Sequence, residues 1–516
     1  MYSHQLWYAV KEVLRISLIL KLHLFVFHVI CPWGVAIMEE TFYWHDYETT
    51  GVNPAIDRPC QFAGLRTDWE LNVIGEPLVI YCKPQDDILP SPIACMLTGI
   101  TPQQASIKGC HEPQFIAKIY SELAMARTCG VGYNSIKFDD EVTRHLLYRN
   151  FFDPYQREWQ CGNSRWDIIN LMRFMRAIRP DGVDWPDYVS GLPSFRLQDL
   201  TAMNGIEHDQ AHDALADVKA TIDLARLVKK KQPQLFAYAL RCRKKLFVSR
   251  FLNVKSGGIF LHSSSRLSPK NHYTALMMPL MVHPINQNAI ICADLSRDPS
   301  IFKHTSEELH HEIFMGNEAL KENNDVPSLL TVHLNRCPIV ATPKLVDSKI
   351  AQKLNINLDK CRANWHALKT MGLKDQLHRL YLGKEYPRKN FVEQQLYDGF
   401  APNSDKLNFE AIRSDAENFI APANVNFSDP RYKQLMINYR ARFFPTSLSS
   451  DERSIWLDDC SFRLTSKDSN YLTIQQFNSE IIELSNAKNC SEQQARLLCD
   501  LTDWGKTVAT KYNLPT

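Results

Sequence analysis

The chain of 516 residues is too long for a single hydrophobic core, and its length predicts about three domains. Charged residues make up 22% of the sequence and apolar residues 45%, which is typical of a globular protein and excludes a disordered or fibrous one. The 59 basic and 57 acidic side chains give a formal net charge of +2, which excludes a uniformly basic coat protein for nucleic acid. Any site for a polyanion must therefore be local.

The N-terminal segment is unusually apolar. Residues 14–38 resemble a signal peptide or a membrane anchor, but Lys21, His23 and His28 interrupt them. The longest apolar run has about 15 residues, fewer than the roughly 20 that a spanning helix needs. We expect residues 1–38 to be an extension outside the fold, with the working protein starting at Met38. A genuine soluble extension and a targeting segment, for which residues 34–36 are a weak cleavage match, are the alternatives.

The 14 cysteines are scattered along the chain without a C-x-x-C pair or a regular spacing. This pattern does not indicate a zinc site or a disulfide framework. Free thiols in a reducing compartment are the simpler interpretation. We therefore expect a cytoplasmic protein that does not associate with a membrane.

The first domain, residues 39–231, alternates predicted strands and helices. Runs rich in β-branched and aromatic residues, separated by turn residues, predict an antiparallel meander. Amphipathic stretches then predict helices, and the combination indicates an α/β domain with a mixed sheet. The predicted strands cover residues 41–49, 61–68 and 72–84, and the predicted helices cover residues 112–125, 138–151, 167–178 and 212–231.

Two further domains follow. Residues 232–384 contain short β-type runs broken by Gly, Pro and Asn, which predict a small antiparallel barrel. Residues 385–516 are charge-mixed, and their apolar periodicity predicts a bundle of amphipathic helices.

The stretch TFYWHDYETTG places Asp46 and Glu48 one residue apart in a strand-forming run. Side chains at positions i and i+2 of a strand share a face, so these carboxylates lie about 7 Å apart, with Tyr47 on the other face. Burying two unpaired negative charges together is unfavourable. A bound cation would stabilise them.

Three more residues complete a candidate two-metal site. Asp139 follows an Asn-x-x-x-Phe sequence at the start of a predicted helix, and AHDALADVKAT contains His212 and Asp217. Five residues on a helix correspond to about 140° of rotation, so His212 and Asp217 reach one site only if His212 precedes the helix.

The expected roles follow from the chemistry of these side chains. Asp46, Glu48 and Asp217 would hold one ion, and Asp46 would bridge to a second ion supported by Asp139. Oxygen ligands favour Mg²⁺ or Mn²⁺ over zinc. A histidine is suited to accept a proton from water at neutral pH, so His212 is the candidate general base.

Each motif alone has an ordinary explanation. A lone Asp-x-Glu pair is usually a solvated strand face, and a lone histidine such as His212 usually belongs to the core or the surface. Asp139 could cap a helix, with Asp140 and Glu141 complementing the helix dipole. The presence of all three motifs in one chain favours the catalytic interpretation.

The Asp-x-Glu, Asn-x-x-x-Phe-Asp and His-x4-Asp motifs, in this order, are similar to those of the histidine-type branch of the DEDD exonuclease superfamily. Longer stretches, including GYNSIKFDDEVTRHLLYRNFFDPY, GLPSFRLQDLTAMNGIEHDQAHDALADV and NYRARFFP, resemble the bacterial exonuclease I family from Thr41 to the C-terminus. The resemblance implies a ribonuclease-H-like exonuclease domain with a mixed sheet, a small SH3-like β-barrel domain and an α-helical C-terminal domain.

The resemblance also implies an activity. Such an enzyme degrades single-stranded DNA processively from the 3′ end, releases 5′-mononucleotides with two Mg²⁺ ions per site (Mn²⁺ may substitute), and acts in DNA repair and recombination. A monomer is expected. The partners implied are single-stranded DNA and the acidic, hydrophobic-ended tail of the single-stranded-DNA-binding protein.

Single-strand binding requires basic groups for phosphates and flat groups for bases. By resemblance, the expected strand contacts are Glu48, Arg144, Tyr155, Trp159, Arg173 and Arg196. Ordinary core packing is the alternative for the two aromatic residues. Residues 226–250 carry nine Lys or Arg and no acid, which is a second candidate phosphate-binding patch. Arg179 and Tyr238 are candidates for the partner-tail pocket.

Two other functions compete with this hypothesis. One is a related exonuclease that degrades short RNA or proofreads a polymerase. The barrel and helical domains argue against it, because those relatives usually consist of a catalytic domain alone or of one fused to a polymerase. The other is a non-catalytic single-strand-binding adaptor, which the loss of any one of the five motif residues would favour.

Overall fold

The computed structural model describes residues 39–208, 212–304, 306–310, 328–383, 389–417, 420–422, 425–487 and 490–514. The predicted extension, residues 1–38, lies outside them. The chain divides into two units, residues 1–40 and 41–516, and all features described below belong to the second unit. Within the described ranges, no helix is both long and apolar enough to cross a membrane.

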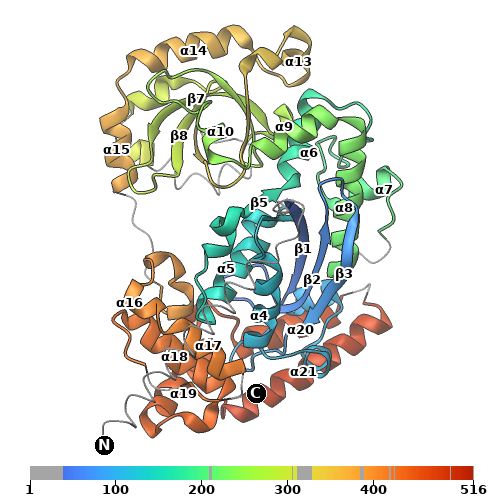
Figure 1. The fold of residues 1–516 in the computed structure, drawn as a ribbon, viewed down its shortest axis with the longest axis vertical. Helices are drawn as coiled ribbons and strands as arrows, with labels where there is room; N and C mark the ends of the chain where they lie inside the picture. Colours follow the sequence, from blue (N-terminus) through green and yellow to red (C-terminus); the bar gives the residue numbers. More distant parts are fainter. Residues whose placement is uncertain are drawn as a thin grey trace, which may run out of the picture. The chain divides into compact units, whose positions relative to one another are not determined.

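A five-stranded mixed sheet forms the centre of the first domain (Figure 1), with the order β3-β2-β1-β4-β5. Strands β1, β2 and β3 pair in an antiparallel manner, whereas β4 and β5 continue the sheet in parallel with β1. The mixed sheet predicted from the sequence is thus confirmed. The strands are β1 (Thr41–Thr49), β2 (Pro59–Thr67), β3 (Val73–Tyr81), β4 (Thr128–Gly132) and β5 (Ser164–Asp167).

Helices cover both faces of this sheet because β1 buries side chains on both sides. Tyr43 and Tyr47 pack in one apolar cluster with residues of α4 and α5. Phe42 and Trp44 pack in a different cluster with residues of α6 and α8. Tyr47 therefore faces away from Asp46 and Glu48, as the strand period predicts. The helices of this domain are α2 (Pro92–Thr98), α3 (Pro102–Lys108), α4 (Glu112–Leu123), α5 (Asp139–Arg149), α6 (Ile168–Ile178), α7 (Leu197–Met203) and α8 (Ala214–Lys231).

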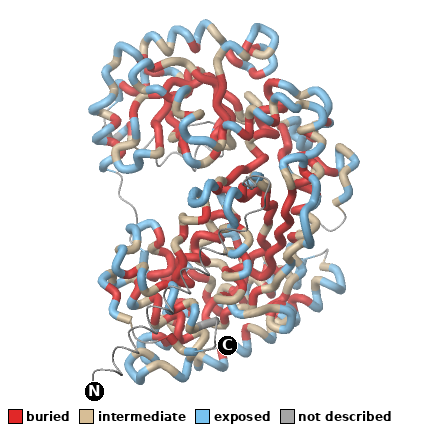
Figure 2. The backbone as a smooth tube through the Cα atoms, viewed as in Figure 1, coloured by how far each residue is buried: buried red, intermediate tan, exposed pale blue. Residues whose placement is uncertain are grey.

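The second domain is built on a curled antiparallel sheet with the order β10-β6-β7-β8-β9. Figure 2 shows buried stretches of chain in both sheets and in helices packed against them, whereas β3, at the edge of the first sheet, contains no buried residue. The strands are β6 (Phe260–Ser263), β7 (Thr274–Val282), β8 (Ala289–Asp294), β9 (Leu329–His333) and β10 (Ile339–Ala341). The accompanying helices are α9 (Pro233–Arg241), α10 (Lys245–Val248), α11 (Ser306–His310), α13 (Ser348–Lys353), α14 (Leu358–Thr370) and α15 (Lys374–Leu382).

The third domain is helical, as predicted, and three of its helices begin with capping boxes at Ser449, Thr473 and Ser491. Its helices are α16 (Asn403–Lys406), α17 (Phe409–Glu417), α18 (Pro430–Phe443), α19 (Ser450–Thr465), α20 (Ile474–Ser485) and α21 (Glu492–Lys511). The predicted boundary at residues 231/232 coincides with the end of α8, whereas the one at 384/385 lies outside the described residues. The domain boundaries stay a prediction.

A buried network of ion pairs joins the first and third domains, and we call it the charge network: Arg58, Asp87, Glu112, Arg149, Glu393, Arg442 and Arg463. Glu393 binds Arg58 and Arg442, and Asp87 binds Arg442 and Arg463. All of these side chains are at most 8% exposed. The two domains therefore share a polar interior.

Candidate active site

The central strand β1 carries the first two acidic residues. Asp46 lies opposite Ala63 of β2, and Glu48 lies opposite Gln61. Burial raises the pKa of Asp46 well above its ordinary value, and the charges of Asp139 and Glu48 raise it further. Burial likewise raises the pKa of Glu48 to about 9. The strand thus holds two carboxyl groups where negative charge is unfavourable.

Asp139 is the first residue of α5 and is buried. Its Oδ1 accepts a hydrogen bond from the backbone N–H of Tyr47 at 3.1 Å, which ties the start of α5 to β1. Burial raises the pKa of Asp139 well above its ordinary value. The neighbouring Asp140 differs, because Arg165 and Arg157 pair with its carboxylate and lower its pKa.

His212 and Asp217 flank the start of α8, in the arrangement that their spacing requires. His212 precedes the helix in a left-handed conformation with φ 69°, and Asp213 is the N-cap. Asp217 lies in the first turn. One potential ligand atom each from Glu48, His212 and Asp217 lie within 4.8 Å of one another. The motifs of β1 and α8 therefore meet.

His208 is a further residue at this site that the sequence analysis missed. Its Nε2 contacts Asp217 Oδ1, and its Nδ1 lies 3.1 Å from Thr201 Oγ1. Gln198 on α7 is another, since its Nε2 lies 3.1 Å from His212 Nε2. The sequence HDQAH contains both histidines. Spacing alone does not tell which of them points at a carboxylate.

The donor set fits a divalent cation. The pKa values of Asp46, Glu48, Asp139 and Asp217 are all raised, chiefly by burial. Negative charge on Asp139 and Asp217 raises the pKa of both strand residues as well. A divalent ion bound among these oxygens would remove the electrostatic cost of ionising the carboxyl groups. Oxygen-rich sites of this kind suit hard cations.

A cleft of about 810 Å³ opens beside the acidic residues. Asp46, His212 and Asp217 line it together with Arg173 and Arg196, two of the predicted strand contacts. The guanidinium of Arg196 lies 5.9 Å from the ring centroid of Tyr188. The aromatic residues that line the cleft, none of them predicted, are Tyr133, Tyr188, Phe195 and Tyr273.

Arg144, Tyr155 and Trp159 are not among the residues that line this cleft. Arg144 is buried, binds the carboxylates of Glu141 and Glu158, and lies 5.3 Å from the ring centroid of Tyr155. Its donors are therefore largely used within the protein. Trp159 is 68% exposed. The role of these three residues in strand binding stays a prediction.

The two candidates for the partner-tail pocket lie on different helices. Arg179 is exposed at the end of α6, where its Nη1 donates to the carbonyl of Ile178. Tyr238 on α9 donates its hydroxyl to the carbonyl of Val340 at 2.7 Å. That hydroxyl is therefore already used, and the pocket also stays a prediction.

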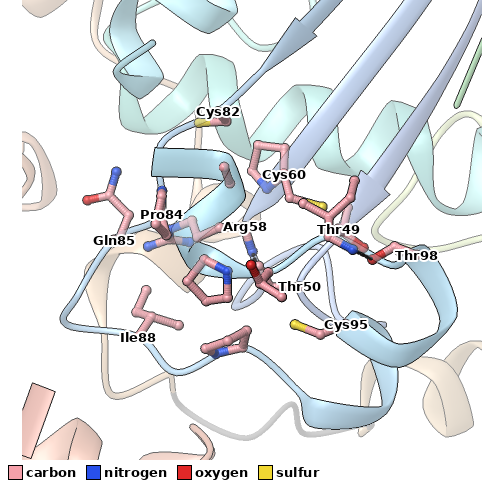
Figure 3. A pocket seen from close by; sticks show the side chains of 16 residues that line it. Thr49, Thr50, Arg58, Cys60, Cys82, Pro84, Gln85, Ile88, Cys95 and Thr98 are labelled. Carbon is pink, nitrogen blue, oxygen red and sulfur yellow. Dashed lines mark hydrogen bonds between the residues drawn. The ribbon is translucent and has the colours of Figure 1, made fainter. Parts of the chain in front are cut away.

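A second cavity lies near the end of β1, and Thr49 and Thr50 are among the residues that line it (Figure 3). Its volume of about 20 Å³ has room for about one water molecule. Burial raises the pKa of the thiols of Cys60, Cys82 and Cys95 that line it. Such thiols are poor nucleophiles and metal ligands, and the cavity is too small for a nucleotide.

The chain matches three protein-family models. They are described as "Exonuclease" over residues 43–225, "Exonuclease I SH3-like domain" over residues 243–382 and "Exonuclease I C-terminal domain" over residues 390–508. Exodeoxyribonuclease I of Escherichia coli (strain K12) is 42% identical over 423 residues, which are 81% of this chain and 89% of that protein.

Solved structures agree with these matches. The zinc-bound complex of E. coli exonuclease I with single-stranded DNA has a TM-score of 0.85 and 38% identity, covering 92% of this chain and 100% of that one. A structure described as SSB/Exonuclease I with an inhibitor has a TM-score of 0.83 and 38% identity, covering 91% and 100%. The similarity extends over all three domains.

Proposed function

The chain belongs to the exonuclease I family, and we propose that it is a magnesium-dependent exonuclease that removes 5′-mononucleotides processively from the 3′ end of single-stranded DNA. One observation carries the proposal. Glu48, His212 and Asp217 place potential ligand atoms within 4.8 Å of one another, and burial and the negative charges of Asp139, Glu48 and Asp217 raise the pKa of Asp46, which lines a cleft with arginines and aromatic rings. The acidic groups suit a metal-assisted hydrolase, and the cleft suits a polyanion with flat bases.

Asp46, Glu48 and Asp217 would hold one ion, and Asp46 and Asp139 a second. Bound there, two divalent ions would stabilise the entering and leaving oxygens of a phosphodiester. Oxygen donors favour Mg²⁺, with Mn²⁺ as a substitute. The zinc-bound structure of the E. coli relative supports a divalent ion in this family.

His212 would take the proton of the attacking water. It precedes α8 in a left-handed conformation, with a ligand atom within 4.8 Å of those of Glu48 and Asp217. Gln198 lies beside its Nε2 and would fix the orientation of the ring. General-base catalysis of this kind contributes about 10²- to 10⁴-fold to the rate.

Arg173 and Arg196 would hold backbone phosphates, because both line the cleft that contains Asp46. Glu48 would contact the terminal nucleotide in addition to a metal ion. Phosphate contacts make binding dependent on salt and largely independent of sequence. Arg144, Tyr155 and Trp159 would act further along the strand, where the third domain approaches α5 through Tyr397.

The two alternatives have less support. An RNA exonuclease or proofreading domain does not need the two domains that match models of the exonuclease I family. A non-catalytic adaptor does not need the five motif residues, and all five are present. We therefore retain DNA degradation in repair and recombination as the proposed role.

We further propose a cytoplasmic monomer that binds the tail of the single-stranded-DNA-binding protein. Every cysteine of the described ranges is a free thiol, which supports a reducing compartment. The SSB/Exonuclease I structure supports the partner. Arg179 and Tyr238 are the proposed contacts for the tail.

The function can be tested with the full chain, Mg²⁺, and matched 5′-labelled and 3′-labelled oligonucleotides as single-stranded DNA, duplex DNA and RNA. We expect mononucleotide release from the 3′ end of single-stranded DNA. Asp46→Ala should abolish it while leaving strand binding in Ca²⁺ measurable, and His212→Ala should lower turnover by about 10²- to 10⁴-fold.

Other outcomes would contradict specific parts of the proposal. Preferential cleavage of RNA would favour the first alternative, and tight binding without cleavage would favour the adaptor. Equal turnover by the wild type and Asp46→Ala would refute the metal site. A negligible loss with His212→Ala would mean that another group takes the proton.

A further inference from the structure

The β6–β7 hairpin of the barrel domain reaches the cleft of the exonuclease domain. Its loop covers residues 264–273, and both Ser265 and Tyr273 line the cleft that contains Asp46. The Nζ of Lys137, two residues before Asp139, donates to Ser265 Oγ at 2.5 Å. A second domain therefore forms part of the wall of the candidate active site.

The backbone of this loop fixes the position of Tyr273. Its N–H donates to the carbonyl of Ser268, and its carbonyl accepts from the N–H of Ser264, both at 2.9 Å. His272 and Tyr273 are both left-handed, with φ of 49° and 57°. Side chains other than glycine rarely adopt this conformation, and it persists only where the surroundings enforce it. The ring of Tyr273 is therefore attached to a constrained turn.

The ring of Tyr273 belongs to a group of aromatic and cationic side chains. Its centroid lies 5.8 Å from the guanidinium carbon of Arg173 and 5.7 Å from the centroid of Phe195, at an interplanar angle of 75°. Arg173 lies 5.8 Å from the ring of Phe195 as well. One ring from each domain thus lies beside the guanidinium of Arg173.

Arg173 retains unused hydrogen-bonding capacity. Its Nη1 donates to Asn170 Oδ1 at 2.8 Å, whereas its Nε is buried without a hydrogen-bond partner among the described residues. The side chain is 8% exposed and lines the cleft. A buried cation with a free donor is suited to an anionic group that enters from the cleft.

We propose that Tyr273 is a nucleobase-stacking residue of the exonuclease cleft, and that its ring positions Arg173 against the adjoining phosphate. This inference rests on the proposed function for its substrate, single-stranded DNA. The ring of Tyr273 would stack on a base while the neighbouring Arg173 binds the phosphate, so the two side chains form one subsite. Stacking accepts any of the four bases, because every base has a flat face. The barrel domain then contributes directly to holding the strand near the reacting end.

The test compares full-length wild type, Tyr273→Phe and Tyr273→Leu, with Ca²⁺ in place of Mg²⁺ so that the strand stays intact. Ile285→Ala is the matched control, since Ile285 is 61% exposed in the next hairpin of the same sheet. Each protein binds a series of oligonucleotides that carry one abasic site at successive positions from the 3′ end. Fluorescence anisotropy gives the dissociation constants.

We expect one position at which an abasic site weakens binding to the wild type by about fivefold to 150-fold, the usual range for one stacked base. Tyr273→Leu should bind the intact strand more weakly by a similar factor and should lose its sensitivity at that position only. Tyr273→Phe and Ile285→Ala should retain the wild-type profile.

A uniform weakening by Tyr273→Leu at every abasic position would overturn the inference, because it would indicate domain packing alone. An unchanged profile would overturn it as well. In both cases the wild type would still cleave single-stranded DNA with Mg²⁺, and the proposed function would stand. A wild type that neither binds nor cleaves single-stranded DNA would instead refute the proposed function.

Discussion

Glu48 shows how the candidate site depends on a cation. Without one, burial and, to a lesser extent, repulsion from Asp217 and Asp139 together raise its pKa to about 9. The folded protein therefore keeps a proton on Glu48 that the unfolded chain releases near pH 4.5. A bound divalent ion must displace this proton, so metal binding is expected to strengthen as the pH rises.

The first prediction concerns the stability of the metal-free protein. Since the folded state binds more protons than the unfolded state between pH 4.5 and about 9, the contribution of Glu48 to the free energy of unfolding falls as the pH rises through that range. Glu48→Gln should remove this contribution. Urea unfolding of both proteins in EDTA should show that the variant gains stability relative to wild type from pH 5 to pH 9.

Saturating Mg²⁺ is the control for this experiment. The ion stabilises the ionised wild type and has less to bind in the variant, so it should reduce or reverse the difference at high pH. A difference in stability that stays constant from pH 5 to pH 9 would contradict the raised pKa.

The sequence predicted the five motif residues, whose roles stay a prediction, but it did not predict their surroundings. Motif spacing was enough to predict these five residues, because each lies on a strand or at the start of a helix: Asp46, Glu48, Asp139, His212 and Asp217. The contact between His208 and Asp217, which lie nine residues apart in the chain, could not be deduced from the spacing of the motifs.

The prediction for Arg144 shows again that the sequence does not reveal the surroundings of a residue. The sequence showed a basic side chain near aromatic residues. It could not show that Glu158, which lies fourteen residues later, binds this guanidinium. Tyr273 lies in the barrel domain, and no motif in the sequence indicated that it lines the cleft.

Among the secondary-structure elements, the position of the start of α8 determines whether the motif on β1 and the motif on α8 lie close together. The N-cap Asp213 accepts a hydrogen bond from Ala216 N at 3.1 Å, and Gln61 of β2 donates to the other oxygen of Asp213 at 3.2 Å. Gln61 Oε1 also accepts from Ala214 N at 3.3 Å. Because Gln61 lies opposite Glu48, the sheet holds the helix start beside the acidic strand.

The second prediction concerns this cap. Asp213→Ala removes the acceptor for Ala216 N and should lower the free energy of unfolding by about 0.5–2 kcal/mol, as for other N-caps. Asp213→Asn keeps the acceptor for Ala216 N and loses only the one for Gln61, so it should cost less. Chemical denaturation measures both effects, and Mg²⁺ titration of activity should show a higher midpoint for Asp213→Ala. Equal stability of the two variants would mean that the cap does not hold α8.

Element boundaries were predicted less well than element types. The helix predicted over residues 212–231 begins at Ala214, because His212 is left-handed and Asp213 is the cap. The strand predicted over residues 61–68 begins at Pro59, since proline is tolerated at the first position of a strand. Helix 112–125 ends at Leu123. These differences depend on local caps and pairing rather than on periodicity.

At the level of the whole molecule, the charge network joins the first and third domains. Arg442 and Arg58 lower the pKa of Glu393 well below its ordinary value despite complete burial, and Arg442 and Arg463 lower that of Asp87. This stabilisation is fully present above the unfolded pKa values and is lost as the pH falls through the folded ones. The charge network should therefore stop stabilising the folded state at acidic pH. Glu48, in contrast, lowers the stability of the metal-free protein as the pH rises.

The third prediction tests the network. Glu393→Ala leaves Arg58 and Arg442 buried with fewer partners, which should lower the free energy of unfolding by about 3–5 kcal/mol. The control is Glu492→Ala, because Glu492 and its partner Arg496 are 95% and 84% exposed. Such a surface pair contributes about 1 kcal/mol or less. Similar losses in both variants, measured by urea unfolding, would contradict the role of the network.

The charge network also relates to the order in which the chain is synthesised. Asp87 precedes Arg463 by 376 residues, and Arg58 precedes Glu393 by 335. On the ribosome, the carboxylate of Asp87 exists long before its partners in the third domain emerge, whereas Arg58 can already pair with Glu112 of its own domain. Asp87 must stay in water until the third domain has been translated. The exonuclease domain therefore cannot complete its interior during its own synthesis, and its final packing waits for nearly the whole chain to be released.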